Sequence, residues 1–177
     1  MNDKYIQNET VRGYMRNVLL CYSRRNAQVG YCQGLNFIVA QLLKRLTEKE
    51  AFWVFTAIME CVLPTDYYSD LMGMKVETTY FKHRLEKDFP KIALHLSGIC
   101  FDPLMYCFKW FTPLYCLEFD PEIACRFMDL ILVFGVKMVT RIMLGIFEFF
   151  SDEILHAKDF GIIVIRKRYR NICQNTK

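Results

Sequence analysis

Residues 29–36, VGYCQGLN, place a glutamine between two glycines directly ahead of an apolar run. The carboxamide of Gln33 accepts hydrogen bonds through its oxygen and donates them through its nitrogen, and it carries no charge. Gly30 and Gly34 permit backbone conformations that let a turn approach another molecule closely. Taken by themselves, these eight residues favour a local role in which Gln33 caps or steadies the following helix.

The other candidate chemical groups lack the spacing of a metal or hydrolytic site. The eight cysteines form no C-x-x-C pair and have no histidine at zinc-finger spacing, so we expect no metal site. The first ten residues are polar and resemble no secretory signal, so we expect the thiols to stay reduced in the cytosol. Because His83, His95, His156 and Cys32 show no Ser-His-Asp or Cys-His pattern, the sequence also argues against a hydrolase.

Length and composition indicate a globular chain with a large core. Its 177 residues suit one domain, and 53% of them are hydrophobic while 24% are charged. A net charge of +4 without a clustered basic face argues against nucleic-acid binding. The longest apolar stretch, residues 127–150, contains Asp129, Lys137 and Arg141, each of which costs about 2.5–3.5 kcal/mol at a bilayer centre. We therefore expect two core helices there rather than a membrane span.

The elements that must position these residues are predicted to be helices throughout, because apolar residues recur at helical spacing and β-alternation is never sustained. Thr47 and Glu50 form a capping box that predicts a helix start. Asp102-Pro103 and Asp120-Pro121 each place a capping acid before a proline, which is also typical of a helix start. Further helices are expected over residues 10–25, 34–46, 47–63, 76–89 and 90–98.

No linker or repeat divides the chain, so the sequence predicts an all-α fold in a single domain over residues 1–177. Residues 153–177 are expected to form a C-terminal helix and a basic tail. In this tail four basic residues fall within five positions, which is typical of a solvated helix end. Weak contact with an anionic membrane is the alternative role.

Three longer stretches together resemble the TBC domain of Rab GTPase-activating proteins. They are VLLCYSRRNAQVGYCQGLNFIVAQLL, EAFWVFTAIMECVLPTDYYSDLMGMKVE and KWFTPLYCLEFDPEIACRFMDLILVFG, and their order and spacing are similar to those of the family. The resemblance covers roughly residues 10–152 and rests on YCQG, AFW, LP-x-DYY and D-P-E-x-A-x-R-x-x-D taken together. It implies an all-helical domain that binds GTP-loaded Rab proteins and accelerates their GTP hydrolysis.

The resemblance gives Gln33 a catalytic role. Hydrolysis needs a water held in line with the γ-phosphate and donors for the charge that spreads over its oxygens. In the TBC family the glutamine at this position is thought to orient that water in place of the GTPase's own glutamine. The resemblance implies that Gly34, Tyr31 and Asn36 contact the partner beside it. Arg24 and Arg25 are further candidates for binding an acidic or phosphate-bearing face, and a solvated pair is the alternative.

The second family motif, an arginine finger within I-x-x-D-x-x-R, is expected to fall at or before Met1, so the sequence resembles an N-terminally truncated TBC domain. Residues 6–12, IQNETVR, match this motif in part. However, Arg12 aligns with the ordinary helix that precedes YSRRN, so we expect it to be solvated. Two functions stay open: a GTPase activator that uses Gln33, and a non-catalytic Rab-binding or scaffolding domain.

The resemblance also implies the partner and the cellular place of the chain. The partner is a Rab-family GTPase in its GTP form, which carries the Mg²⁺ and the nucleotide, so the chain itself is expected to need no cofactor and not to be an enzyme. A cytoplasmic location with at most peripheral contact to endomembranes is expected. For the fold, Trp53 and Trp110 are predicted to lie in the core, and Asp129 is predicted to form a buried hydrogen bond or ion pair with Arg126 or Arg141.

Overall fold

The computed structural model describes residues 4–99 and 103–157, and all regular structure within these ranges is helical. This agrees with the predicted all-α fold. The helices, in chain order, are α1 (Lys4–Gln7), α2 (Glu9–Arg25), α3 (Leu35–Leu43), α4 (Glu48–Ala57), the π-helical turn η1 (Ile58–Val62), α5 (Met72–Asp88), α6 (Pro90–Gly98), α7 (Pro103–Phe111), α8 (Pro121–Phe134), α9 (Lys137–Phe149) and α10 (Ser151–His156).

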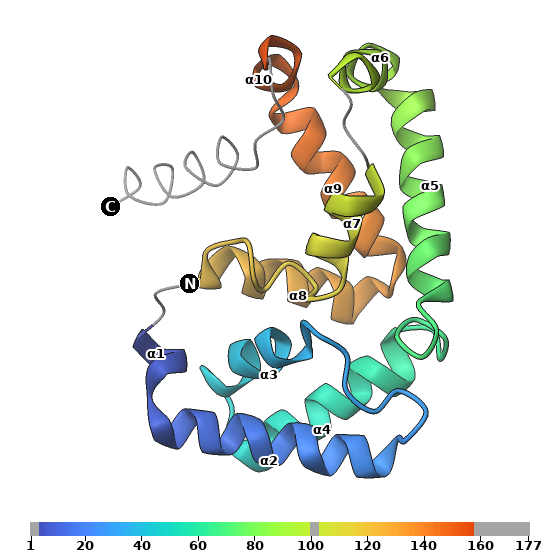
Figure 1. Ribbon diagram of the computed structural model, residues 1–177. Helices are drawn as coiled ribbons and strands as arrows, with labels where there is room; N and C mark the ends of the chain where they lie inside the picture. The colour runs from blue at the N-terminus through green and yellow to red at the C-terminus, as the bar shows by residue number, and fades with distance from the viewer. Residues whose placement is uncertain (1–3, 100–102, 158–177) are drawn as a thin grey trace.

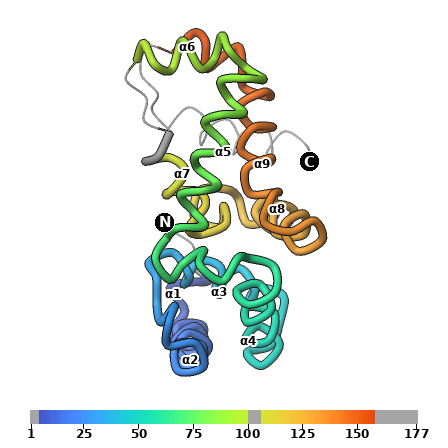
Figure 2. Tube along the Cα trace, turned by 90° about the vertical axis from the view of Figure 1, so that its right-hand side faces the viewer, coloured from blue at the N-terminus to red at the C-terminus, as the bar shows by residue number. Residues whose placement is uncertain are grey.

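The helices form an elongated body with two ends (Figures 1 and 2). At one end α2 packs against both α3 and α4, and α3 packs against α4. From there α5 runs toward the other end, where α6 meets α10, and α9 packs along α5. Helices α7 and α8 lie between the two ends (Figure 1). The end of α7 comes near the start of α3.

Local capping signals define several helix starts, as the sequence predicted. The Thr47 hydroxyl accepts from the Glu50 main-chain nitrogen, and the Glu50 carboxylate accepts from the Thr47 nitrogen at 2.9 Å, which completes the capping box. At α8 the Asp120 carboxylate accepts from the Glu122 nitrogen at 3.0 Å, and Pro121 occupies the first helical turn. The Asp102-Pro103 cap lies partly outside the described residues.

Other boundaries differ from the sequence prediction because they depend on backbone conformations and local hydrogen bonds that hydrophobic periodicity does not reveal. Helix α5 begins at Met72 rather than at residue 76, since Leu71 adopts a left-handed φ of 61° and the Asp70 carboxylate accepts from the Met72 nitrogen at 2.9 Å. Helix α3 ends at Leu43, three residues early. A π-helical turn follows α4, with the Leu63 nitrogen donating to the Ile58 carbonyl at 3.0 Å.

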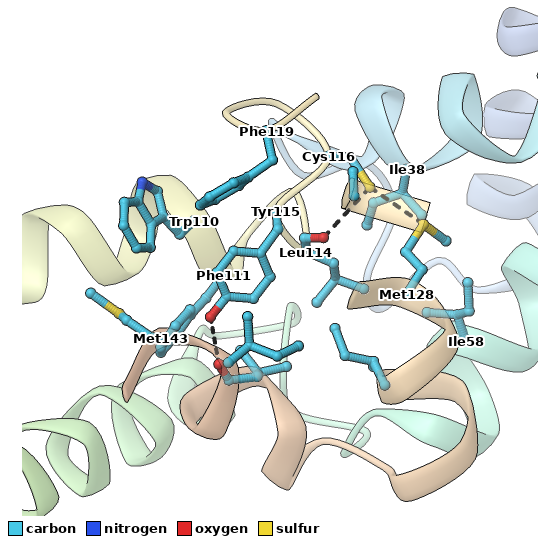
Figure 3. Close-up of a cluster of buried hydrophobic side chains, with 14 of the residues drawn as sticks. Ile38, Ile58, Trp110, Phe111, Leu114, Tyr115, Cys116, Phe119, Met128 and Met143 are labelled. Carbon is cyan, nitrogen blue, oxygen red and sulfur yellow. Dashed lines mark hydrogen bonds between the residues drawn. The ribbon is translucent and has the colours of Figure 1, made fainter. Parts of the chain in front are cut away.

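The middle of the body is an aromatic core around the residues that follow α7 (Figure 3). The rings of Trp110, Tyr115, Phe119 and Phe127 meet at centroid distances of 5.3 to 6.1 Å, mostly edge to face. The buried Tyr115 hydroxyl donates to the Val139 carbonyl at 2.5 Å. These contacts hold the segment after α7 against α8 and α9.

Two sequence predictions about buried residues were wrong. Trp110 is 1% exposed, as expected, but Trp53 is 53% exposed on the outer face of α4. Asp129 forms the predicted ion pair with Arg126, at 3.9 Å, but the pair is exposed on α8 rather than buried, and the neighbouring Met128 takes the buried position. The side chains of Met128 and Asp129 project about 100° apart around the helix axis. The buried face of α8 therefore accommodates only one of them, and the methionine packs there.

The apolar stretch over residues 127–150 forms α8 and α9, as the sequence predicted. Within residues 4–99 and 103–157, no helix has the length and apolarity needed to cross a membrane. The six cysteines in these ranges form no disulfide. Cys100, Cys173 and the basic tail lie outside the described residues.

Candidate functional site

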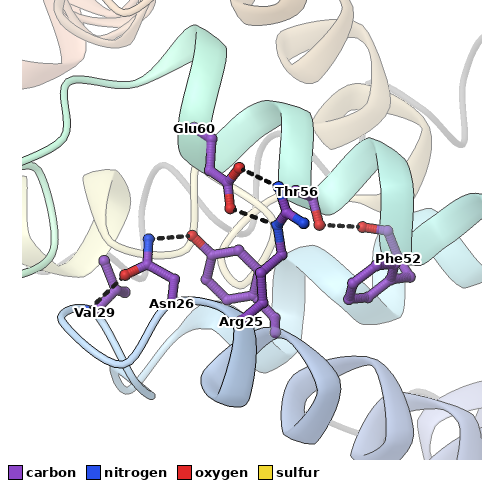
Figure 4. Close-up of polar contacts among 7 residues, drawn as sticks. Arg25, Asn26, Val29, Phe52, Thr56 and Glu60 are labelled. Atoms are coloured by element: carbon purple, nitrogen blue, oxygen red, sulfur yellow. Dashed lines mark hydrogen bonds and ion pairs between the residues drawn. The ribbon is translucent and has the colours of Figure 1, made fainter.

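The glutamine turn, residues 29–34, connects α2 to α3, and its first part is fixed by Asn26 (Figure 4). The Asn26 amide donates to the Tyr22 hydroxyl at 3.1 Å, and its oxygen accepts from the Val29 nitrogen at 3.2 Å. The Gly30 nitrogen donates to the Asn26 carbonyl at 2.9 Å. Since Tyr22 is 1% exposed, the turn begins from a residue anchored in the core.

The second part of the turn depends on glycine. Gly30 and Gly34 have φ values of 57° and 114°, a region that residues with a side chain rarely adopt. A Cβ atom built on Gly34 would lie 2.8 Å from the Thr112 methyl carbon and 3.4 Å from the Pro113 nitrogen. The chain therefore needs glycine at position 34 both for its conformation and for its close approach to the segment after α7.

Between these glycines, Gln33 is exposed, and its amide forms no hydrogen bond with any described residue. The main chain of Gly34 occupies the cap position of α3, and no side chain caps it. The local capping role that the eight residues suggest by themselves is therefore absent. A polar amide held outward on a rigid turn is available to another molecule.

Gln33 lies at the edge of a groove of about 530 Å³ between the turn and the end of α7. Its walls are mainly apolar, and the groove holds one cationic side chain, Lys109, whose ammonium lies 3.6 Å from the Glu118 carboxylate. Burial raises the pKa of the Cys32 thiol, which disfavours a reactive thiolate there. The lining residues are Cys32, Gln33, Gly34, Phe37, Leu71, Phe108, Lys109, Thr112, Pro113 and Leu117.

A second groove, of about 450 Å³, lies on the other side of the turn along the outer face of α2. Tyr31 and Asn36 line it, with the Tyr31 hydroxyl 3.5 Å from the Asn36 side-chain oxygen. Arg12 and Arg16 line it as well. The sequence predicted that Tyr31 and Arg24 lie beside Gln33 in one binding surface. In the structure Tyr31 lines a different groove from Gln33, and Arg24 lines neither groove.

The neighbouring arginines differ from each other in a way that the sequence did not indicate. The Arg25 guanidinium forms a two-pronged contact with Glu60, which follows α4 (Figure 4). It also lies 5.9 Å from the centre of the Trp53 ring. Hydrogen bonding to Arg25 lowers the pKa of the Glu60 carboxyl. Arg24 is exposed and forms no ion pair with the described residues. Arg24 is thus the freer of the two for an external partner.

Comparison with known proteins determines the family. The Rab-GTPase-TBC domain model matches residues 1–155. The chain belongs to the Rab-GTPase-TBC domain family. It is 34% identical over 171 residues to TBC1 domain family member 2B of Xenopus tropicalis, and this alignment covers 95% of the chain and 18% of that protein. It is 30% identical to the GTPase-activating protein gyp2 of Schizosaccharomyces pombe, covering 96% of the chain and 24% of that protein.

The fold of a solved TBC domain agrees with this assignment. The crystal structure of the Chlamydomonas flagellar RabGAP TBC domain superposes with a TM-score of 0.81 at 27% identity, over 93% of this chain and 55% of that one. The family resemblance and the all-α TBC fold that the sequence predicted are therefore confirmed. The chain spans about a fifth of the curated relatives, so their whole-length activities belong to longer proteins.

Proposed function

We propose that this TBC domain binds a GTP-loaded Rab-family GTPase and accelerates GTP hydrolysis through Gln33. One observation carries the proposal: an uncharged, exposed amide, with no hydrogen-bond partner among the described residues, lies on a turn with two left-handed glycines. Such a group suits a water that must be oriented toward the γ-phosphate, because its oxygen accepts from the water while its nitrogen donates to phosphate.

The chemistry of the partner completes the site. The Rab protein carries GTP and Mg²⁺, so the TBC domain contributes positioning and hydrogen bonds rather than a cofactor. The exposed Tyr31 and Arg24 and the half-buried Asn36 supply further binding surface near the glutamine turn, and Gly34 positions Gln33. Since Rab proteins act on membranes, the domain works in the cytoplasm with peripheral contact to endomembranes.

A second transition-state group, an arginine, is needed for strong acceleration, and such a group is worth roughly 10³–10⁵ in rate in related GTPase systems. Arg12 does not serve this purpose, because it lines the α2 groove and Gln33 lines the other one. The arginine comes from an I-x-x-D-x-x-R segment upstream of the chain or from another protein. With neither, the domain binds a Rab and accelerates hydrolysis weakly.

The experiment is single-turnover GTP hydrolysis by a panel of GTP-loaded Rab proteins. It compares this chain with a longer protein that carries the upstream arginine motif, each with Gln33→Ala and Arg12→Ala variants. In the longer protein, Gln33→Ala should lower the maximal rate on the order of 10²-fold, as for loss of one transition-state hydrogen bond, with little loss of Rab binding. Arg12→Ala should leave the rate unchanged.

Two results would contradict this assignment. A Gln33→Ala protein that stimulates as well as its parent removes Gln33 from the reaction. Binding of a Rab protein without stimulation in either length of protein supports the non-catalytic Rab-binding domain instead.

A further inference from the structure

Two adjacent tyrosines between η1 and α5 differ in one hydrogen bond. Tyr67 and Tyr68 are both buried, with ring centroids 5.0 Å apart. The Tyr68 hydroxyl donates to the main-chain carbonyl of Thr112 at 2.7 Å. The Tyr67 hydroxyl has no hydrogen-bond partner among the described residues. Removal of one hydroxyl therefore breaks a long-range contact, and removal of the other breaks none.

Thr112 is also the residue that touches the glutamine turn. Its methyl carbon lies against Gly34 so closely that an added Cβ atom would be 2.8 Å away, and Thr112, Pro113 and Gln33 line the same groove. The backbone of the residue next to Gln33 therefore rests on Thr112. Any shift of Thr112 moves the support of the turn.

The Thr112 carbonyl needs an external partner to stay in place. It directly follows the last residue of α7, where carbonyl groups lack partners within the helix. The chain then turns sharply through Leu114 and Tyr115, whose φ values of 44° and 67° are unfavourable for residues with side chains. A partly buried carbonyl without a donor is unfavourable, so the Tyr68 hydroxyl holds this strained segment in one conformation.

We propose that Tyr68 is a positioning residue for Gln33. Its hydroxyl fixes the Thr112 carbonyl, Thr112 in turn presses on Gly34, and Gly34 sets the direction in which the Gln33 amide projects. The effect on GTP hydrolysis rests on the proposed function of Gln33. The effect on the turn itself does not, so the two are measured separately.

Hydrogen–deuterium exchange of residues 29–37 tests the positioning itself, without a Rab protein. The amides to follow are those of Leu35 and Phe37, which donate to the Cys32 and Gly34 carbonyls at 3.2 and 3.0 Å. Tyr68→Phe should make them exchange about tenfold faster, since loss of one hydrogen bond of ordinary strength permits local opening. Tyr67→Phe is the matched control, because it removes a buried hydroxyl that has no hydrogen-bond partner in residues 4–99 and 103–157, and it should leave these amides unchanged. Equal exchange in both variants, or equally faster exchange across the whole chain, would overturn the proposal.

A second pair of variants tests the Thr112 contact in case Tyr68→Phe reduces the fraction of folded protein. Thr112→Ser deletes the methyl group that meets Gly34, and Thr112→Val keeps it. We expect the Leu35 and Phe37 amides to exchange faster in Thr112→Ser and to keep the parent's protection in Thr112→Val. The opposite order would contradict the proposal.

In a Rab panel, Tyr68→Phe should lower the maximal rate of stimulated hydrolysis about tenfold while the half-saturating concentration stays within about twofold, because the amide is misdirected but the binding surface is kept. Tyr67→Phe should match the parent. A change confined to the half-saturating concentration would show that Tyr68 supports binding instead. The parent in this assay is the longer protein that carries the upstream arginine motif. If it fails to stimulate any Rab, the proposed function of Gln33 is wrong, and the exchange data still decide the role of Tyr68.

Discussion

Arg25 and Glu60 lie 35 residues apart in the chain and face each other through two parallel hydrogen bonds of 2.9 and 3.0 Å. The pair connects the end of α2 to the turn that follows α4. It therefore fixes the place from which the glutamine turn departs. Trp53 covers the guanidinium on one side, with the arginine 5.9 Å from the ring centre.

Arg25→Ala should lower the melting temperature at pH 7, whereas Arg24→Ala should leave it unchanged. The pKa of Glu60 is lowered in the folded state by Arg25, so the unfolded chain binds more protons than the folded chain as pH falls. The stabilisation is therefore present above the usual glutamate pKa and is lost as pH falls through the lowered folded pKa. The difference in melting temperature between parent and Arg25→Ala should shrink from pH 7 to pH 3, and a constant difference would contradict the pairing.

Gly34→Ala should destabilise the domain by about 1–3 kcal/mol, because alanine is strained at a φ of 114° and its Cβ meets Thr112. Gly13→Ala is the matched control, since Gly13 lies within α2 with open space around it, and alanine should stabilise that helix by up to about 1 kcal/mol. Urea unfolding of both variants measures the two effects. Equal stability of Gly34→Ala and the parent would show that the turn accommodates a side chain at position 34 and does not require glycine there.

Glu77→Gln should stabilise the domain at pH 7. Burial raises the pKa of the Glu77 carboxyl, and the Thr140 hydroxyl donates to it. The folded chain therefore binds more protons than the unfolded chain between the usual and the raised pKa, so the ionised form costs stability as pH rises through that interval. Glutamine removes this cost and still accepts from Thr140. Melting curves should show a gain at pH 7 that disappears at pH 4 and below.

The two tryptophans should differ in access to solvent. Acrylamide should quench the fluorescence of Trp53, which is 53% exposed, and should leave most of the emission of Trp110, which is 1% exposed. Trp53→Phe should remove the quenchable part, and Trp110→Phe should leave it. Protection of both tryptophans would indicate that Trp53 lies in an interface between copies of the chain.

Features set by neighbouring residues were predictable from the sequence. The capping box of Thr47 and Glu50 and the Asp120-Pro121 start act within one turn of a helix, so the sequence pattern was sufficient. The prominence of Gln33 came from the resemblance to TBC domains, since the eight residues alone favoured a cap. Its catalytic role stays a prediction.

Features that join distant segments were not predictable. Trp53 sits in the apolar run AFWVF, yet the partner helices of α4 pack on its other face, which only the assembled fold shows. Leu71 adopts a left-handed conformation that local preference disfavours, because surrounding packing imposes it. The contact of Thr112 with Gly34 spans two motifs that the sequence treats as independent.

Helix α3 begins directly after Gln33, and seven of its nine residues are buried. Because such a helix has almost no free face, the helices around it hold it along most of its length. The direction of the Gln33 amide is thus inherited from the whole domain rather than from a mobile loop. Under the role proposed for Gln33, stimulation of GTP hydrolysis should therefore persist on heating until the domain melts and then vanish within the same narrow temperature range, with no partly active intermediate.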